Sequence, residues 1–554
     1  MPTLKYIRWL SCFLSLTASS CADLTPRLSV EPPLKNVILI IGDGMGPQQI
    51  GLLLSYARQA PNSVIKNRRT ALDRVLNNGQ LGISLSYPDN ALVVDSAASA
   101  SQIATGKFAG SEMLGLDKDG NPQTNIIEHA KRLGKATGLV SDTRITHATP
   151  AAFAAHQTHR SQENDIADDL LAAEPDVMFS GGFNNWIPQH ANDKHSALHA
   201  QLSQLIKHSF PVTSERKDNK NLLTVAQQKN YTLAFNSTQM QQARGKTLGL
   251  FADSSMANGI IEAHNKNTAQ HTEPTLTEMT QKALEILDFN PKGFFLMVEA
   301  GQIDWACHHN DTGLLLHEML RFNDMLNTVL DWAAKRNDTL IIVTADHETG
   351  GFGFSYSNAN PPKGRHLSGS AFAGGTLFQP KFNFGDPMIL DKLYAQQRSY
   401  HDIFAEFTAL PKNQQTAKTL VKKVNHDTSF AITETDATNI LKTKIKPNYH
   451  SDQSKIAKNT PIMPVNAAFF IGDMDNRENL LAQAVATKQS AVWATGSHTS
   501  TPVYVFTQGP KHITAQFKKI LHHTELGQLA LDALQCSHAN AVCNKPPPPA
   551  NVVE

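Results

Sequence analysis

Residues 294–310 read Phe-Phe-Leu-Met-Val-Glu-Ala-Gly-Gln-Ile-Asp-Trp-Ala-Cys-His-His-Asn, an apolar run followed by carboxylate and imidazole side chains. The apolar run at 293–298 predicts a buried strand, which Glu299, Asp304 and His308 follow at its carboxyl end. In open α/β sheets that edge is where functional sites are built. Carboxylate oxygens and an imidazole nitrogen suit Zn²⁺, and positions with oxygen alone suit Mg²⁺. The stretch therefore predicts a metal site at a strand end.

Similar apolar, β-branched runs recur along the chain and alternate with amphipathic segments. The further predicted strands are 36–41, 136–140, 339–343 and 503–506, and the predicted helices are 126–133, 276–287 and 314–336. Strands that alternate with helices indicate a parallel sheet covered on both faces. We therefore predict an α/β fold, a three-layer sandwich with a central, mostly parallel sheet. Residues 160–290 have weaker strand signals, and we expect peripheral connections there.

One long polar stretch interrupts this alternation. Residues 355–490 contain Pro361-Pro362 and Gly374-Gly375 and a centre rich in Lys, Asn and Thr. We predict a large insertion, a crown or a lid, with helices near 399–424 and 435–443. The predicted catalytic domain is then formed by 30–354 and 491–544 together, followed by a Pro-rich tail at 545–554.

The N-terminus has the pattern of a secretory signal. Lys5 and Arg8 precede a short apolar segment at 9–18, which is too short to span a bilayer. We predict a signal peptide at 1–21 and export to the periplasm or beyond. Cleavage before Cys21 would allow a lipid anchor there, but Ala18 stands where such sites usually carry Leu, so we favour ordinary cleavage nearby.

Charge and cysteine content narrow the function classes further. A formal net charge of +1 over 554 residues gives no electrostatic case for nucleic acid or an anionic membrane surface. In an oxidising compartment we expect Cys536 and Cys543 to pair. Cys307 fits no cysteine-rich zinc pattern, and a buried thiol is the favoured interpretation.

The other strand ends also carry polar side chains. Asp43 lies between two glycines after the first strand, and Asp95-Ser96 precedes a helix of small residues that Gly106 would end. An N-cap is the simpler role for either Asp95 or Ser96. Alternatively, Ser96 projects at a helix N-terminus, where backbone N–H groups favour a phosphate. No Gly-x-Ser-x-Gly pattern surrounds Ser96, so a metal would have to activate its hydroxyl.

The remaining candidates follow the same logic. Thr149 stands before Pro150, where a helix N-cap is the simpler role. Arg160 could be a solvated surface residue, or its planar fork could bind phosphate. Asp346-His347 follows the predicted strand 339–343, and His498 precedes 503–506.

Taken together, these motifs resemble the alkaline phosphatase family, in the family's order between residues 36 and 509. The matching segments are Ile41–Gly46, Asp95–Ala100, His147–Pro150, Arg160, Val298–His308, Thr344–Glu348 and Gly496–Thr499. The resemblance implies two Zn²⁺ and one Mg²⁺. It assigns Asp304, His308 and His498 to one zinc, Asp346, His347 and Asp43 with the Ser96 oxygen to the other, and Asp43, Thr149 and Glu299 to magnesium.

The same resemblance implies that Arg160 clamps the phosphoryl oxygens and that Asp95, His147 and Trp305 lie in the second shell or near the substrate. Some members carry Lys or His where this chain has Trp305. Its combination with His147 resembles marine-bacterial members.

We therefore expect hydrolysis of small phosphate monoesters at alkaline pH through a phosphoserine on Ser96, and a homodimer, as in many relatives. One alternative is a phosphodiesterase or sulfatase of the same superfamily. Ser96-Ala97-Ala98-Ser99 lacks the Pro and Arg of a sulfatase motif, and Ser96 with Arg160 favours monoesters over diesters. The other alternative is a secreted metal- or phosphate-binding protein without catalysis.

Overall fold

The computed structural model describes residues 33–268, 271–445, 459–461, 469–470 and 475–535. The predicted signal peptide at 1–21, the Cys536–Cys543 pair and the Pro-rich tail lie outside the described residues. Within the described part of the chain, no helix combines the length and hydrophobicity needed to cross a membrane.

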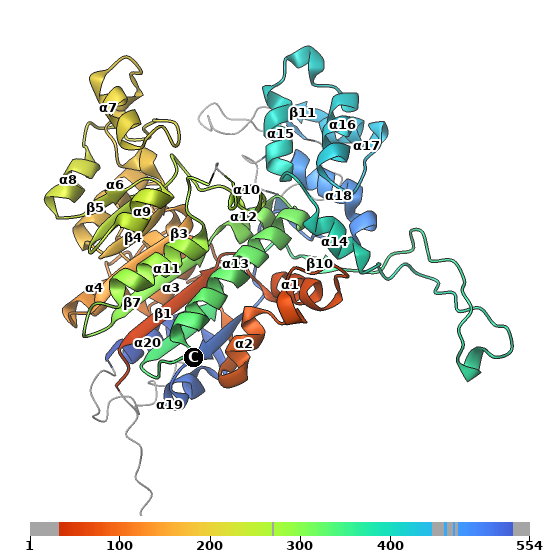
Figure 1. The fold of residues 1–554 in the computed structure, drawn as a ribbon, viewed down its shortest axis with the longest axis horizontal. Coiled ribbons are helices and arrows are strands. Elements are labelled where there is room, and N and C mark those ends of the chain that lie inside the picture. Colours follow the sequence, from red (N-terminus) through yellow and green to blue (C-terminus); the bar gives the residue numbers. More distant parts are fainter. Residues whose placement is uncertain (1–32, 269–270, 446–458, 462–468, 471–474, 536–554) are drawn as a thin grey trace, which may run out of the picture.

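A ten-stranded sheet forms the centre of the molecule (Figure 1), with the strand order β16-β2-β15-β8-β1-β7-β3-β4-β6-β5. The strands are β1 (Asn36–Gly42), β2 (Gln80–Leu85), β3 (Ala136–Arg144), β4 (Val177–Gly181), β5 (Thr232–Ala234), β6 (Thr247–Leu250), β7 (Phe294–Ala300), β8 (Thr339–Thr344), β15 (Val503–Gln508) and β16 (Ile520–His522). Only β15 runs antiparallel to its neighbours, so the prediction of a mostly parallel α/β sheet is confirmed.

Helices cover both faces of this sheet. One face packs against α1 (Pro47–Gln59), α2 (Ala71–Asn78), α9 (Ser237–Gln242), α10 (Gly259–Asn265), α11 (Leu276–Leu287) and α13 (Thr312–Ala333). The other packs against α3 (Ser96–Thr105), α4 (Ile126–Arg132), α6 (Glu163–Ala173), α7 (Ala197–Leu205), α8 (Leu222–Gln228) and α20 (His523–Gln535). Along β1, Ile38 and Ile40 point to the first core while Val37, Leu39 and Ile41 point to the second. Because both faces are buried, the strand is apolar throughout rather than alternating.

The region 160–290 differs from its expected peripheral role. It supplies β4, β6 and β5, which extend the sheet at one edge. These strands are only five, four and three residues long, so their apolar runs are too short to stand out in the sequence.

Residues 355–490 leave and rejoin the body at one place, because β10 (Gly353–Phe354) pairs antiparallel with β13 (Ala491–Val492). The segment contains α14 (Met388–Tyr394), α15 (Tyr400–Ala409), α16 (Ala417–Asp427), α17 (Glu434–Leu441) and α18 (Arg477–Gln489). Helices were predicted near 399–424 and 435–443, and the chain forms α15 and α16 at the first range and α17 at the second. Pro411, which lacks the N–H that a continuing helix needs, lies between α15 and α16.

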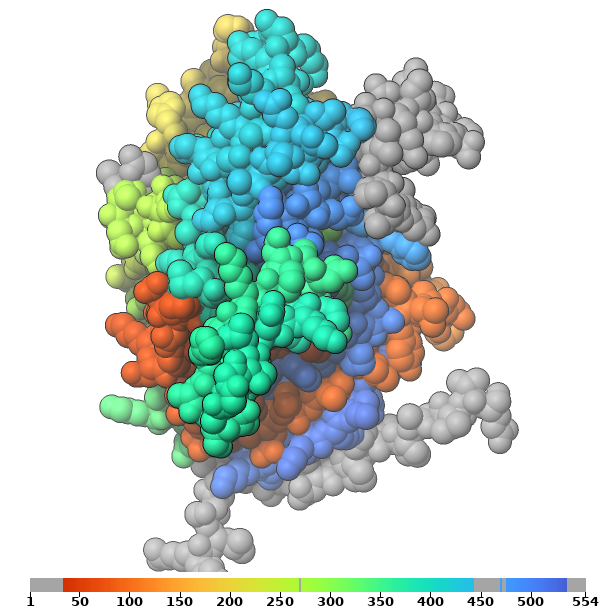
Figure 2. All heavy atoms as spheres, turned by 90° about the vertical axis from the view of Figure 1, so that its right-hand side faces the viewer, coloured from red at the N-terminus to blue at the C-terminus, as the bar shows by residue number. Residues whose placement is uncertain are grey.

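Before these helices, residues 355–387 form an extended arm that projects from the body (Figure 1) and lies across the face seen in Figure 2. Isolated bridges join Ser357 to Asn383 and Arg365 to Phe378 across the arm.

Candidate active site

The carboxyl ends of three neighbouring strands meet at one point. The register pairs Ile41 of β1 with Glu299 of β7 and with Thr344 of β8. Asp43 and Asp346 follow within two residues, and Glu299, Asp43 and Asp346 are all fully buried. The parallel ladder therefore brings together three carboxylates that lie up to 303 residues apart in sequence.

The turn after β1 is possible only with glycine at position 44. Gly44 has φ +70°, and a Cβ there would lie 2.8 Å from the Cα of Asp304. The Gly44 N–H donates to Asp346 Oδ1 at 3.1 Å. The glycine thus allows β1, β8 and the segment carrying Asp304 to approach closely.

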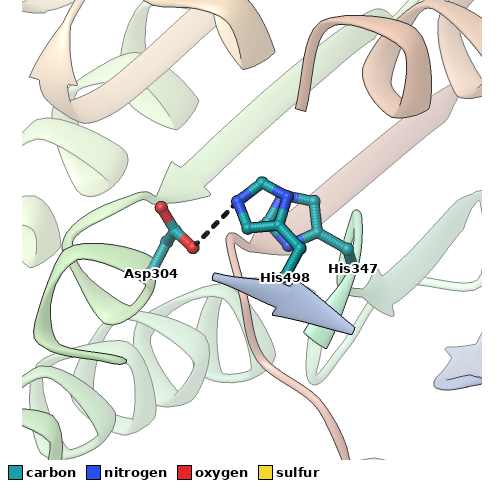
Figure 3. A group of neighbouring side chains, drawn as sticks. All are labelled: Asp304, His347 and His498. Carbon is teal, nitrogen blue, oxygen red and sulfur yellow. Dashed lines mark ion pairs between the residues drawn. The ribbon is translucent and has the colours of Figure 1, made fainter. Parts of the chain in front are cut away.

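A first cluster gathers around Asp304 on α12 (Gln302–His308), and Figure 3 shows the Asp304 carboxylate facing the imidazole of His498. Asp304 lies 3.1 Å from His308 Nε2 and 3.7 Å from His498 Nε2, and the two Nε2 atoms are 3.2 Å apart. The Nδ1 atoms of His308 and His498 each lie 2.8 Å from a backbone carbonyl, of Gly496 and Val94 respectively. Imidazoles held this way present Nε2 to one point, the arrangement typical of metal ligands.

A second cluster joins Asp43, Asp346 and His347. The His347 Nε2 atom lies 3.0 Å from Asp346 Oδ2 and 3.5 Å from Asp43 Oδ1. Ser96 Oγ lies 3.1 Å from the same nitrogen. The ring of His347 also stacks on His498 with centroids 3.6 Å apart, so the first two clusters are in contact.

A third cluster lies on the other side of Asp43. Thr149 Oγ1 donates to Asp43 Oδ2 at 3.3 Å, and ligand atoms of Asp43, His147 and Glu299 lie within 4.8 Å of one another. The N-cap interpretation of Thr149 was wrong, because α5 (Ala148–Ala151) begins after His147 and Thr149 lies inside the helix. His147, expected in the second shell or near the substrate, has a potential ligand atom within this cluster.

Two residues outside the predicted set hold Glu299. Ser141 and Thr143 both donate to Glu299 Oε2, Thr143 at 3.2 Å. Ser141 is paired with Glu299 in the β3–β7 register. The signal was present: both follow the apolar run at 136–140, as the other site residues follow theirs.

Ser96 is the first residue of α3, and Asp95 is its N-cap. Asp95 accepts hydrogen bonds from the N–H groups of Ala97 and Ala98, so the capping role is confirmed. Arg160 donates to Asp95 Oδ2 at 3.1 Å, and its other terminal nitrogen lies 3.3 Å from His147 Nε2.

These groups line a cavity of about 980 Å³. Its lining includes Ser96, Arg160, His147, Asp304 and Trp305. The ring of Trp305 meets that of His147 edge-on at 5.8 Å between centroids. The cavity therefore opens onto the nucleophile candidate and the guanidinium together.

The buried carboxylates of the site favour the binding of cations. Burial raises the pKa of Asp43 well above its ordinary value, and neighbouring carboxylates add to the effect. Burial likewise raises the pKa of Glu299 to about 8 and lowers that of His498 to about 3. Burial would also raise the pKa of Asp304, but the imidazoles around it, His308 first, hold that pKa well below its usual range.

The donor set fits metal ions. Asp43 Oδ1, Asp346 Oδ2 and Glu299 Oε1 are buried and accept no hydrogen bond. Buried polar atoms are normally partnered, and buried charges are paired or coordinate metals. Oxygen and imidazole donors together suit Zn²⁺, and the oxygen-rich third cluster suits Mg²⁺.

The chain was compared with known proteins. The family model described as alkaline phosphatase matches residues 34–536. Alkaline phosphatase 4 of Bacillus subtilis is 31% identical over 407 residues, which cover 72% of this chain and 76% of that protein. Alkaline phosphatase of Escherichia coli is 31% identical over 371 residues, 60% of this chain and 74% of that protein.

Two solved structures share the fold. The cold-active alkaline phosphatase from Shewanella sp. matches with a TM-score of 0.62 at 25% identity, covering 90% of this chain and 99% of that one. Thermus thermophilus alkaline phosphatase matches with a TM-score of 0.69 at 23% identity, covering 93% and 94%.

Proposed function

Because this chain belongs to the alkaline phosphatase family, whose members hydrolyse phosphate monoesters, we propose that it does so through a phosphoserine on Ser96. The observation that carries the proposal is the position of Ser96 Oγ, 3.1 Å from His347 Nε2 at the N-terminus of α3 and within the cavity. The helix N-terminus favours a phosphate beside this hydroxyl.

We assign two Zn²⁺ and one Mg²⁺ to the three clusters. Asp304, His308 and His498 would hold one zinc; Asp43, Asp346 and His347 the other; and Asp43, Thr149 and Glu299, with His147 close by, the magnesium. Bound there, the cations would supply positive charge that lowers the pKa of a serine hydroxyl or of water and offsets the charge of the phosphoryl group. Without that charge, buried carboxylates beside Ser96 would repel a phosphate dianion.

The reaction has two steps, and both involve Ser96 Oγ. Ser96 Oγ, having lost its proton, attacks phosphorus; the Oγ–P bond forms while the ester P–O bond breaks, and the alcohol leaves with the bonding pair and gains a proton. Water then attacks the same phosphorus, the P–Oγ bond breaks, and Ser96 regains a proton as phosphate departs. Since the serine and the water react as anions, we expect an alkaline pH optimum.

Arg160 orients the phosphoryl group in this scheme. Its contacts with Asp95 and His147 fix the guanidinium at the cavity wall. A planar fork held in this way can donate two parallel hydrogen bonds to phosphate oxygens. A monoester has three unsubstituted oxygens, so one remains for a cation when two accept from Arg160, whereas a diester has only two in all. We therefore favour monoesters over diesters.

The test uses the Ser96→Ala variant and a chelated wild-type sample, with p-nitrophenyl phosphate as substrate across pH. Turnover should fall by several orders of magnitude in both, because a nucleophile and its activating charge act as a unit. In the wild type, an acid quench during turnover should leave phosphate on the peptide containing Ser96. Near-native turnover by Ser96→Ala would refute the scheme, and faster cleavage of the bis(p-nitrophenyl) ester would favour a diesterase. Ser203→Ala, on α7, serves as the control.

We infer export to the periplasm or beyond, directed by a signal peptide at residues 1–21. Ordinary signal cleavage is favoured over a lipid anchor at Cys21, and the intact mass of the mature protein distinguishes the two.

We also infer a homodimer in which the arm at 355–387 packs on a second copy. The arm exposes Tyr356 and Phe384, at 59% and 65%, with ring centroids 5.3 Å apart, and contiguous exposed apolar surface marks interaction sites.

A further inference from the structure

A second group of potential ligands lies where the insertion meets the catalytic body, outside the three clusters already described. It consists of His309, the residue after α12, His401 on α15 and Glu478 on α18. One potential ligand atom from each lies within 4.8 Å of the others. The insertion supplies two of the three residues, so the group exists only when the insertion is docked.

Both imidazoles lie beside the carboxylate of Glu478. Glu478 Oε2 lies 3.2 Å from His309 Nε2, and Glu478 Oε1 lies 3.0 Å from His401 Nδ1. The two imidazole rings are nearly parallel, with an interplanar angle of 8° and centroids 5.2 Å apart. Ligand atoms about 2.0–2.2 Å from a tetrahedral zinc lie roughly 3.3 Å from one another. Each imidazole nitrogen lies close to that distance from one oxygen of the Glu478 carboxylate, and one ligand atom from each of the three residues lies within 4.8 Å of the others.

The burial of Glu478 points to a cation. Its side chain is 1% exposed, and in the described part of the chain its ion-pair partners are the two histidines, with no Lys or Arg among them. Nδ1 of His309 is also buried and has no hydrogen-bond partner. A buried carboxylate needs a compensating charge, and a metal held by both imidazoles would supply it. His401 is 61% exposed, which leaves room for water at the fourth position.

We propose that His309, His401 and Glu478 bind a fourth metal ion, a zinc of structural role that fastens the insertion to the catalytic body. Two imidazole nitrogens and one carboxylate form a ligand set that Zn²⁺ prefers. The ion would join α12, which also carries Asp304 and His308, to α15 and α18 at the rim of the cavity. Docking of the insertion then depends on zinc, independently of the reaction assigned to Ser96.

The test counts metal ions in the full-length protein. Wild type, His401→Ala and Glu478→Gln are dialysed against the same free Zn²⁺ concentration, and zinc per chain is measured by mass spectrometry. Both variants should bind one zinc fewer than the wild type. His426→Ala, on α16 of the same insertion and 82% exposed, is the matched control and should keep the wild-type count.

A second measurement, of thermal stability, keeps the test decisive if one of the variants folds poorly. Added Zn²⁺ should raise the thermal midpoint of chelated wild type by more than that of His401→Ala, since an ion that binds only the folded state stabilises it. Equal zinc counts and equal zinc-induced shifts in wild type and His401→Ala would overturn the proposal and leave a hydrogen-bonded His–Glu–His group. Because the readout is a difference in metal count, it does not depend on whether Ser96 carries the reaction.

Discussion

The strand-end site and the insertion at 355–490 are built in opposite ways. In the site, Asp43, Asp346 and His347 have 0% exposure and are placed by adjacent parallel strands. In the arm of the insertion, Tyr356 and Phe384 are more than half exposed, and isolated bridges join the arm's two sides. Adjacent parallel strands place the groups of the site, whereas the insertion joins the body through the short β10–β13 pair and through side-chain contacts. We therefore expect substitutions in the two regions to affect different properties.

The junction between the two regions depends on a few buried polar residues. Asp311, the N-cap of α13, accepts hydrogen bonds from the Leu314 N–H in the body and from Tyr400 N–H and Gln396 Nε2 in the insertion. A substitution in the site should therefore alter the rate of the reaction. A substitution at the junction should alter the free energy of unfolding, and one in the arm should alter only the oligomeric state. Three variants test this division, from the largest expected effect to the smallest.

Arg160→Ala should reduce kcat/KM for p-nitrophenyl phosphate by roughly 10²–10³-fold, the usual effect of removing one donor to a charged transition state. Arg160→Lys should recover only part of the loss, because an ammonium cannot donate two parallel bonds. The thermal midpoint should stay close to that of the wild type. Arg132→Ala, an exposed arginine on α4, is the control. An unchanged kcat/KM in Arg160→Ala would show that Arg160 does not bind the phosphoryl group.

Asp311→Asn should lower stability at the junction and alter its pH dependence. Burial raises the pKa of Asp311 to about 6, above its ordinary value of 3.8. Because the pKa of Asp311 is higher in the folded state than in the unfolded state, binding of its proton stabilises the folded protein. This contribution to the free energy of unfolding is complete below about pH 4 and is lost as the pH rises to about 6. A difference of two pH units corresponds to about 3 kcal/mol. The Asn variant cannot titrate, so this part of the slope should vanish.

Urea unfolding of chelated wild type and Asp311→Asn between pH 4 and 7 measures the effect. The stability gap between them should narrow as pH rises, while Asp331→Asn, an exposed change on the same helix, should follow the wild type throughout. The Asn side chain also loses an acceptor for the Tyr400 N–H, which costs about 1–3 kcal/mol at every pH. A gap that is constant with pH would contradict the assigned pKa.

The double variant Tyr356→Ser, Phe384→Ser should have the smallest energetic effect. Exposed substitutions usually change stability by no more than about 0.5 kcal/mol, so folding and turnover should be unaffected. Light scattering during size-exclusion chromatography should show a dimer for the wild type and a larger monomer fraction for the variant. Phe289→Ser, an exposed aromatic outside the arm, is the control. A monomeric wild type, or a variant as dimeric as wild type, would exclude the arm as the interface.

Much of the sheet and of the site could be predicted because both depend on local patterns. The apolar runs at 36–41 and 339–343 became β1 and β8 almost residue for residue, and Leu276–Leu287 was predicted with its observed bounds. What failed was short or context-dependent. The strands at the β4–β6–β5 edge carry too few residues for a periodicity, and Thr149, for which an N-cap was the simpler role, lies inside α5.

The sequence by itself determined which residue types follow each strand, because a buried parallel strand must be apolar and the first polar residue after it marks the edge of the sheet. The sequence places Ser141 and Thr143 just after a predicted strand, but it could not determine that they hold Glu299, because that contact depends on β3 and β7 being neighbours in the sheet. The approach of His147 to Asp43 likewise depends on the tertiary structure. The grouping of His309 with His401 and Glu478 was likewise decided only by the tertiary structure. His309 follows α12, whereas His401 and Glu478 lie on α15 and α18, and only the packing of the insertion on the body brings their ligand atoms within 4.8 Å of one another.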